Sequence, residues 1–215
     1  EGSRAHVEPS LSFRRDGGSG FWALRGGYKY TEYNLDGSPS NLAFYGDQQT
    51  DRGIGFFSAD AGLFFERDIG AENGRLVQTL EPRIYYLSQG YEAQDRLPVF
   101  DSVPLSMTFD QLFSDDRFAG LDRIGDADRL TLAATSRVLS ASGKELGSFA
   151  LAYMDHFSDP RVQWPGRADI GASDLVAGEQ SITGQQGWQL RARQLWNKDL
   201  SAWEELGASP HLRGS

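Results

Sequence analysis

Residues 75–138 constrain the fold of this chain more than any other segment. Two stretches with strand-like alternation, RLVQTLEPRIYYL and RLTLAATSRV, flank residues 88–128, which show neither a helical period nor an apolar run. A connection of that length without secondary structure is uncommon in a compact soluble domain. Outer-membrane barrels, by contrast, join their strands by short turns on one side and long loops on the other. The segment therefore predicts a barrel with a long extracellular loop at 88–128.

An alternation of period two, which is typical of β-strands, recurs along the chain. In residues 20–34, for example, Trp22, Leu24 and Tyr28 share one face, while Arg25 and Lys29 lie on the other. No long segment carries a helical stripe. The pattern predicts nine strands, at residues 5–14, 20–34, 53–68, 75–88, 129–139, 145–157, 172–182, 186–197 and 202–213.

The chemistry of the two strand faces favours an antiparallel transmembrane barrel over a soluble sandwich. The apolar faces carry aromatic residues toward their ends, as in the aromatic girdles of membrane barrels. Several predicted strands also exceed the roughly five or six residues that are usual in soluble proteins. The opposite faces carry Arg, Lys, Glu, Gln and Thr, which a wet lumen accommodates and a sandwich core does not. A soluble β-sandwich or β-helix with one wet face is the alternative that the pattern leaves open.

Charge and composition exclude several classes of function. The formal charge is −9, with 30 acidic and 21 basic residues, whereas nucleic-acid binding needs clustered Lys and Arg. Cysteine is absent, and the three histidines lie too far apart in sequence for a zinc motif. Neither a nucleophile motif nor a phosphate-binding loop is present. The sequence therefore predicts no enzyme, no cofactor and no metal site.

Several short motifs stand in a defined order along the chain. They are RAHVEP at residues 4–9, FFERD at 64–68, QTLEPR at 78–83, YYL at 85–87, FDS at 100–102, LF at 112–113, RFAGLDRI at 117–124 and TSR at 135–137. Their order and spacing resemble the barrel of the LPS-assembly outer-membrane protein family, LptD (older name OstA). The likeness is most specific over residues 78–137 and becomes looser beyond residue 160.

This resemblance implies that residues 1–215 are part of a larger barrel in the outer membrane of a Gram-negative bacterium. It implies a translocon that inserts lipopolysaccharide into the outer leaflet, with a lipoprotein plug of the LptE type inside the barrel. Periplasmic bridge proteins would reach that translocon through a separate N-terminal domain. Because the chain begins with neither a methionine nor a signal peptide, we expect an interior piece that lacks this domain and both barrel ends. A generic porin or channel, and a soluble secreted carbohydrate-binding β-domain, are the alternatives.

Six charged residues on the predicted polar faces are candidates for contact with lipid or with the plug protein. Arginine could bind lipid phosphates through two parallel hydrogen bonds. If these residues do not bind lipid, they form cross-strand ion pairs in a wet lumen or contact the plug protein. The candidates are Glu66, Glu81, Arg83, Arg137, Arg191 and Arg193.

Two prolines, Pro9 and Pro82, each follow a glutamate inside a predicted strand. Proline removes a donor from the ladder and is usually found at edges, strand starts or bulges. We expect both residues to distort their strands. A bulge that sets the curvature of the barrel is favoured over a functional weakening of strand pairing.

The predicted loop at 88–128 is acidic, and its aspartates include Asp101, Asp115 and Asp122. Their oxygens could bind calcium, but the segment does not match the EF-hand pattern. We therefore expect a solvated acidic loop held by Arg117 and Arg123.

Overall fold

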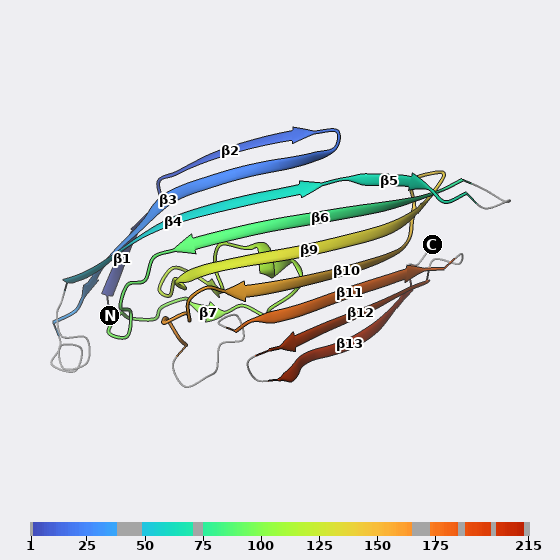
Figure 1. The fold of residues 1–215 in the computed structure, drawn as a ribbon. Coiled ribbons are helices and arrows are strands. Elements are labelled where there is room, and N and C mark those ends of the chain that lie inside the picture. The colour runs from blue at the N-terminus through green and yellow to red at the C-terminus, as the bar shows by residue number, and fades with distance from the viewer. Residues whose placement is uncertain are drawn as a thin grey trace.

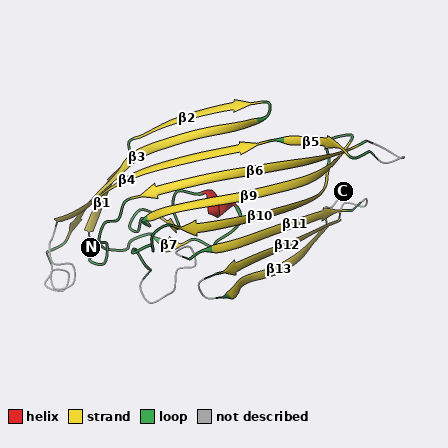
Figure 2. Cartoon of the chain, viewed as in Figure 1, coloured by secondary structure: helices red, strands yellow, loops and turns green. Residues whose placement is uncertain are grey.

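The computed structural model describes residues 2–37, 49–70, 75–164, 173–184, 188–198 and 201–212. These residues form one large antiparallel sheet and one small two-stranded sheet (Figure 2). The single helical element in the described ranges is a 3-10 turn, η1, at Asp110–Phe113. None of the described helical residues forms a segment long and apolar enough to span a membrane.

The large sheet contains eleven strands, and consecutive long strands are antiparallel neighbours (Figure 1). Its order is β1-β3-β4-β6-β9-β10-β11-β12-β13, with β2 beside β3 and β5 beside β6. The predicted all-β antiparallel fold is thus confirmed, although the sheet is an open, curved wall and does not close into a barrel. The strands are β1 Gly2–Val7, β2 Ser10–Gly17, β3 Gly20–Leu35, β4 Gln49–Leu63, β5 Phe65–Asp68, β6 Leu76–Gln89, β9 Ala127–Ser140, β10 Glu145–His156, β11 Leu175–Thr183, β12 Trp188–Asn197 and β13 Ala202–Leu212.

The connections have different lengths at the two ends of the sheet. At one end, called here the short-turn end, residues 18–19 join β2 to β3 and residues 141–144 join β9 to β10. At the other, called the long-loop end, residues 90–126 follow β6 and residues 157–174 follow β10. The link from β12 to β13 is an exception, because it is short and lies at the long-loop end. The predicted alternation of short and long connections holds for the other described strands.

Two predicted strands are each divided in the structure. The predicted strand 5–14 becomes β1 and β2, with a break at Glu8 and Pro9, and the predicted strand 53–68 becomes β4 and β5, with a break at Phe64. The register is the same on both sides of the first break, since Val7 pairs with Tyr30 and Ser10 with Gly27.

Pro82 also lies in an unshifted ladder, opposite Ala134 of β9. Neither proline therefore sits in a bulge, contrary to the sequence-based expectation. A proline lacks only the N–H, so a strand can skip one hydrogen bond without adding a residue. Register shifts occur instead at Glu145–Gly147 of β10 and at Leu195–Trp196 of β12.

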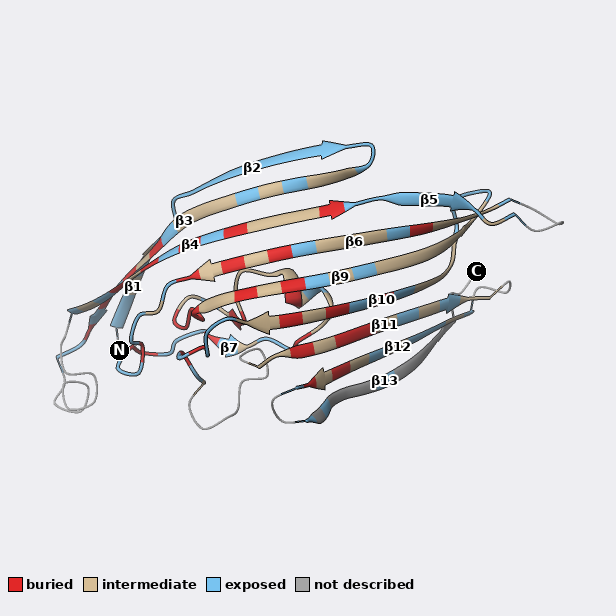
Figure 3. Ribbon diagram, viewed as in Figure 1, coloured by how far each residue is buried: buried red, intermediate tan, exposed pale blue. Residues whose placement is uncertain are grey.

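The predicted period-two faces are present along the sheet (Figure 3). On β4, Arg52, Ile54 and Phe56 are buried, while Gly55 and Phe57, which alternate with them, are exposed. The outer face is apolar, and aromatic pairs lie toward both of its ends. Phe13 packs on Trp22 near the short turns, and Trp196 packs on Trp203 near the long loops, each with ring centroids 5.0 Å apart. This arrangement is typical of a lipid-facing surface.

Residues 90–126, called here the inner loop, fold back over the concave face of the sheet (Figure 1). The loop contains two short paired strands, β7 at Val103–Pro104 and β8 at Phe118–Ala119. The prediction of a solvated loop is wrong, because Asp122, Arg117 and Arg123 have exposed fractions of only 0%, 5% and 4%. Apolar loop residues contribute to the packing: Met107 and Leu112 join Ala152, Met154, Leu175, Ala177 and Leu195 of β10–β12 in one buried cluster.

Candidate lumen site

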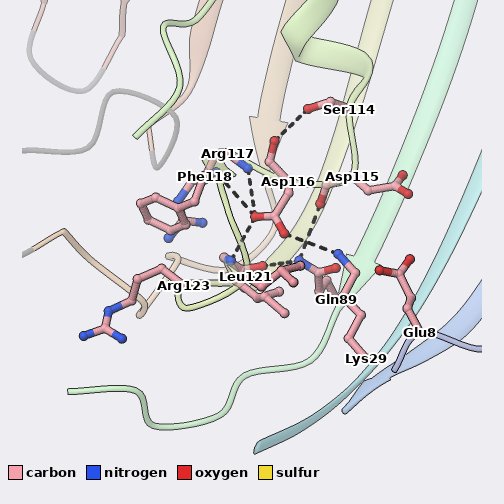
Figure 4. Close-up of polar contacts among 12 residues, drawn as sticks. Glu8, Lys29, Gln89, Ser114, Asp115, Asp116, Arg117, Phe118, Leu121 and Arg123 are labelled. Carbon is pink, nitrogen blue, oxygen red and sulfur yellow. Dashed lines mark hydrogen bonds and ion pairs between the residues drawn. The ribbon is translucent and has the colours of Figure 1, made fainter. Parts of the chain in front are cut away.

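Basic side chains on the inner face of β1 and β3 meet aspartates of the inner loop. Arg25 and Lys29 are an even number of residues apart on β3, and Arg4 of β1 lies opposite Tyr33 on the same face, so all three point to the same side of the sheet. Figure 4 shows Lys29 of β3 pointing at the loop, with Asp115 and Asp116 beside it. The ion pairs are Arg4 with Asp101 (2.8 Å) and with Asp122 (2.6 Å), Arg25 with Asp115, and Lys29 with Asp116 (3.3 Å).

Asp122 is the most completely buried of these carboxylates. One of its oxygens accepts from the Arg4 guanidinium, at 2.6 Å, and from the Tyr33 hydroxyl, at 3.3 Å. The other accepts from the backbone N–H groups of Phe100 and Asp101, at 2.6 and 2.8 Å. Both oxygens are thus satisfied, which a buried charge requires. Asp122 therefore joins β1 and β3 to two separate parts of the loop.

Arg52 of β4 is the buried cation beside Asp122, and it is 1% exposed. Its guanidinium donates to the backbone oxygens of Leu121 (2.7 Å) and Asp122 (2.8 Å). It also donates to Gln94 Oε1 at 2.8 Å and to Thr31 Oγ1 at 3.0 Å. Arginine suits this position because its planar group carries several donors in a fixed geometry.

Asp116, the partner of Lys29, has a different electrostatic environment from Asp122. Burial raises the pKa of its carboxyl above the ordinary value, while Lys29 and the N–H of Gly125 act in the opposite direction. Asp101, by contrast, is partly exposed, and the hydrogen bond from Arg4 holds the pKa of its carboxyl well below the usual range. The loop is therefore anchored by carboxylates with opposite pKa shifts.

The short helix η1 is held over the middle of the sheet by two side chains of β9. Thr131 Oγ1 donates to Leu112 O at 2.9 Å, and the Arg129 guanidinium donates to Ser114 O at 2.6 Å. These bonds satisfy carbonyl oxygens at the end of the helix, which have no partner within it. Two side chains of β9 thus attach η1 to the sheet.

The described residues 157–164, which follow β10, are attached to the inner loop through Asp126. The Asp126 carboxylate accepts from the backbone N–H of Arg161 and of Val162, both at 2.8 Å. Arg117 donates to Asp126 O at 2.9 Å and to Val162 O. The two loops therefore form one connected unit in the described residues.

Most of the six charged residues predicted from the sequence do lie on the inner face, in cross-strand ion pairs. Arg137 bridges Glu81 (3.1 Å) and Glu145 (3.2 Å), which joins β9 to β6 and β10. Arg193 pairs with Glu179 of β11 at 3.0 Å. These contacts match the predicted ion pairs of a wet lumen, while contact with a lipid or a plug stays a prediction.

Arg83 also forms a cross-strand ion pair, whereas Glu66 and Arg191 are in none among the described residues. Arg83 pairs with Asp60 at 2.8 Å, and its guanidinium lies 3.9 Å from the ring centroid of Phe113 in the inner loop. Glu66 is exposed on β5, opposite Thr79 and apart from the ion pairs of β9–β12. Arg191 has no hydrogen-bond or ion-pair partner among the described residues.

An open cavity of about 440 Å³ lies between the inner loop and strands β9–β12, near the short-turn end. Three of the predicted residues line it, namely Arg137, Arg191 and Arg193. The structure therefore gathers these three arginines at one place, and it leaves Glu66 and Arg83 elsewhere.

Arg4, Lys29, Arg52 and Asp122 were not among the six candidate contact residues predicted from the sequence. One signal for Arg52 was available, because the alternation of Ile54, Phe56 and Ser58 continues backward to it. The predicted strand began at residue 53 and so left Arg52 in a loop. For Asp122 the sequence carries no signal of its own, since its partner Arg4 lies 118 residues away.

A curved antiparallel sheet with an apolar outer face and a charged inner face defines this chain as a segment of a transmembrane β-barrel wall. Its long connections run at one end of the strands, as in barrels of the outer-membrane type.

The family model described as LPS transport system D, LptD, matches residues 1–212. The LPS-assembly protein LptD of Xanthomonas oryzae is 38% identical over 216 residues, which cover 99% of this chain and 26% of the relative. Its namesake in Nitrosococcus oceani is 37% identical over 207 residues, covering 95% and 27%, and the one in Pseudomonas aeruginosa is 33% identical over 235 residues, covering 99% and 25%. The chain belongs to the LptD family. It spans about a quarter of the length of these relatives.

Proposed function

We propose that this chain is part of the translocon that inserts lipopolysaccharide into the outer leaflet of a Gram-negative outer membrane. Within it, the chain forms barrel wall and the loops that cover the wall's inner face. The observation that carries this proposal is the match to the LptD family over residues 1–212. The relatives are named LPS-assembly proteins, and the name supplies the cargo.

The chemistry of the two faces supports this role. Lipopolysaccharide is an amphiphile, so its transporter needs a surface compatible with lipid and a separate wet compartment. The outer face offers large apolar side chains such as Leu24, Ile84 and Leu151, each more than 40% exposed. The inner face offers ion pairs and hydroxyl groups, which only a hydrated environment tolerates at such density.

The proposed protein partners follow from the same assignment to the LptD family. The lumen of the complete barrel would hold a lipoprotein plug of the LptE type, and bridge proteins in the periplasm would deliver the lipid through a separate domain. Arg83, Arg137 and Arg193 already pair with carboxylates. These arginines are thus less suited to binding lipid phosphates than to contacting a polypeptide plug or to joining neighbouring strands of the wall. The role is transport and assembly, so no reaction is proposed.

Two other functions compete with this assignment. A generic porin or channel would also use a wet inner face with a loop folded into it, and it is the second candidate. A soluble secreted carbohydrate-binding domain fits poorly, because contiguous exposed apolar residues on one sheet face are unusual in a soluble monomer.

Depletion of the full-length protein in its host tests the proposal. Newly made lipopolysaccharide is expected to stay in the periplasm or inner membrane, and re-expression of the wild-type gene is expected to restore surface display. If surface lipopolysaccharide is unaffected while uptake of small solutes falls, the protein is a channel and the proposal is wrong.

A further inference from the structure

A second pocket, of about 310 Å³ and called here the outer pocket, lies near the short-turn end, where β6 runs between β5 and β9 (Figure 1). The strand register places it on the outer face. Phe65 lies opposite Leu80, and these side chains are 51% and 49% exposed. Ser136 lies opposite Phe149, which is 50% exposed. Five of the seven lining residues alternate to this face, namely Phe65, Arg67, Gln78, Leu80 and Ser136.

The outer pocket coincides with interruptions in strand pairing on both sides of β6. The β6–β9 ladder has no pairs at Thr79 and Leu80, although its register is the same before and after them. The backbone N–H of Arg137 donates to the Thr79 hydroxyl oxygen at 3.2 Å. On the other side, pairing of β6 with β4 ends at Gly62, and pairing with β5 begins at Phe65. The backbone of β6 is therefore less completely paired beside the pocket than along the rest of the strand.

Arg67 is held at the rim of the pocket by two neutral side chains. Its Nε and Nη2 donate to Gln78 Oε1 at 2.9 and 2.6 Å, and Gln78 Nε2 donates to Ser136 Oγ at 2.9 Å. No carboxylate of the described residues forms an ion pair with Arg67, since the adjacent Asp68 pairs with Arg75. Three of the five guanidinium N–H groups and the Ser136 hydroxyl proton remain available. The rim thus presents an uncompensated positive charge in a fixed orientation.

An apolar track leads from this rim toward the middle of the sheet. Pro82 and Ala134 face each other with short side chains, and beyond them Ile84 lies opposite Leu132, at 46% and 45% exposure. A strand rises about 3.3 Å per residue, so Ile84 lies about 20 Å from Gln78 along β6. A strand tilt of about 35–45° reduces this to about 15 Å along the bilayer normal. That is half of a hydrocarbon core of about 30 Å, so the track spans one leaflet.

The position and the chemistry of the outer pocket restrict its occupant. Short turns face the periplasm in outer-membrane barrels, so the rim lies at the level of the head groups of the periplasmic leaflet. An arginine on a lipid-facing surface is costly at the midplane of the bilayer and is tolerated at this depth. A free anion would leave Phe65 and Leu80 uncovered, and an uncharged apolar molecule would leave the charge of Arg67 unpaired. An amphiphile with an anionic head group satisfies both parts.

We propose that the outer pocket binds a phospholipid of the periplasmic leaflet, with the phosphate on Arg67 and one acyl chain on the track from Leu80 to Ile84. Gln78 occupies one edge of the guanidinium, and the free edge can donate two parallel hydrogen bonds to phosphate oxygens. The hydroxyl of Ser136 donates a further hydrogen bond to the same phosphate. The proposal requires only that the outer face contacts the bilayer, so it is independent of the cargo that the protein transports.

Native mass spectrometry of the full-length protein, purified in detergent as the complex that it forms, tests the phospholipid site. The probe is dioleoyl phosphatidylglycerol, and the readout is the dissociation constant of the most tightly bound lipid. Arg67→Gln should weaken binding about tenfold, as expected for lost hydrogen bonds to a charged group. Arg67→Lys keeps the charge but loses the planar fork, so it should weaken binding at least about threefold. Arg15→Gln is the matched control, because Arg15 is also exposed on the outer face near the short turns, opposite Trp22, but does not line the pocket; its affinity should stay within about twofold of wild type.

Two competitors and a second lipid identify the part of the ligand that is recognised. Dioleoylglycerol has the same chains without the phosphate and should bind at least about tenfold more weakly. Equal binding of the two lipids, or equal affinity of wild type and Arg67→Gln, would overturn the proposal. Displacement of the lipid by inorganic phosphate would assign the pocket to a free anion, and displacement by lipopolysaccharide at a lower concentration than phosphatidylglycerol would assign it to the cargo; either result would also overturn it.

Ser136→Ala provides a second variant in case Arg67→Gln does not assemble. It removes one hydroxyl from the outer face and should weaken phosphatidylglycerol binding about threefold, whereas unchanged affinity would refute the phosphate contact. None of these outcomes concerns the surface display of lipopolysaccharide, so failure of the phospholipid site leaves the proposed transport function standing.

Discussion

Substitution of Asp122 by asparagine should release the inner loop from the sheet. The change preserves the size of the side chain, removes its charge, and replaces one of its two acceptor oxygens by an NH₂ group. Asp122 uses one oxygen for Arg4 and Tyr33 and the other for two backbone N–H groups. Asparagine can satisfy only one of these two sets, so a donor will face a donor in either orientation.

The free-energy cost of Asp122→Asn for the closed loop follows from the burial of this carboxylate. Loss of a hydrogen bond to a charged partner costs about 1.5–3 kcal/mol, and breaking a buried ion pair costs about 3–5 kcal/mol. Arg4 keeps its second partner, Asp101, at 2.8 Å, so the lower end of the second range applies. We expect about 3 kcal/mol, which corresponds to a rise of about 100-fold in the population of the open loop.

Hydrogen exchange of the full-length protein in detergent measures this opening. The amides of Phe100 and Asp101 report it directly, because both donate to Asp122. Their protection should fall about 100-fold in Asp122→Asn. Asp95→Asn is the matched control, since Asp95 lies in the same loop and is exposed; a change of about 0.5 kcal/mol or less, or about twofold, is expected there. Protection within twofold of wild type in Asp122→Asn would refute the role of this carboxylate in holding the loop.

Four further predictions address other parts of the molecule. Asp126→Ala should increase exchange at the amides of Arg161 and Val162 at least tenfold, because each donates to this charged carboxylate; unchanged exchange there would contradict the link between the two loops. The lowered pKa of Asp101 predicts that its contribution to loop stability is complete above its unfolded pKa of about 3.8 and is lost only as the pH falls below that value. Exchange corrected for intrinsic rates should show this loss in wild type, and Asp101→Asn should lack it. Pro82→Ala should leave lipid export and plug binding unchanged, because the β6–β9 ladder keeps one register across Pro82; a defect in surface lipopolysaccharide would show that local weakening of pairing matters. Residues 1–215 expressed alone should aggregate in detergent-free buffer, because open sheet edges and an apolar outer face are exposed together, whereas a sharp, cooperative melt of a soluble monomer would disprove this.

Local geometry made several features predictable from the sequence. Successive side chains of a strand point to opposite sides, so Trp22 and Leu24 could be assigned to one face and Arg25 and Lys29 to the other before any contact was known. The same rule placed Arg137, Arg191 and Arg193 on the inner face. The motifs at 78–137 indicated the family, which the match over residues 1–212 confirms.

Strand interruptions were not predictable in the same way. A proline in a strand is compatible with a bulge or with one missing hydrogen bond, and only the pairing partner distinguishes these cases. The register of Pro82 opposite Ala134 shows the second case. The local sequence around a proline does not contain that partner.

An antiparallel sheet with one apolar and one polar face, long connections at one end and the likeness to the LptD family could all be inferred from residues close together in the chain. The packing of the acidic loop into the concave face, where Arg4 meets Asp122 across 118 residues of chain, is visible only in the folded molecule. The same holds for the three arginines from β9 and β12 that line one cavity. The physical reason is that alternation is a property of neighbouring residues, whereas ion pairs and cavities arise between segments that only the curvature of the sheet brings together.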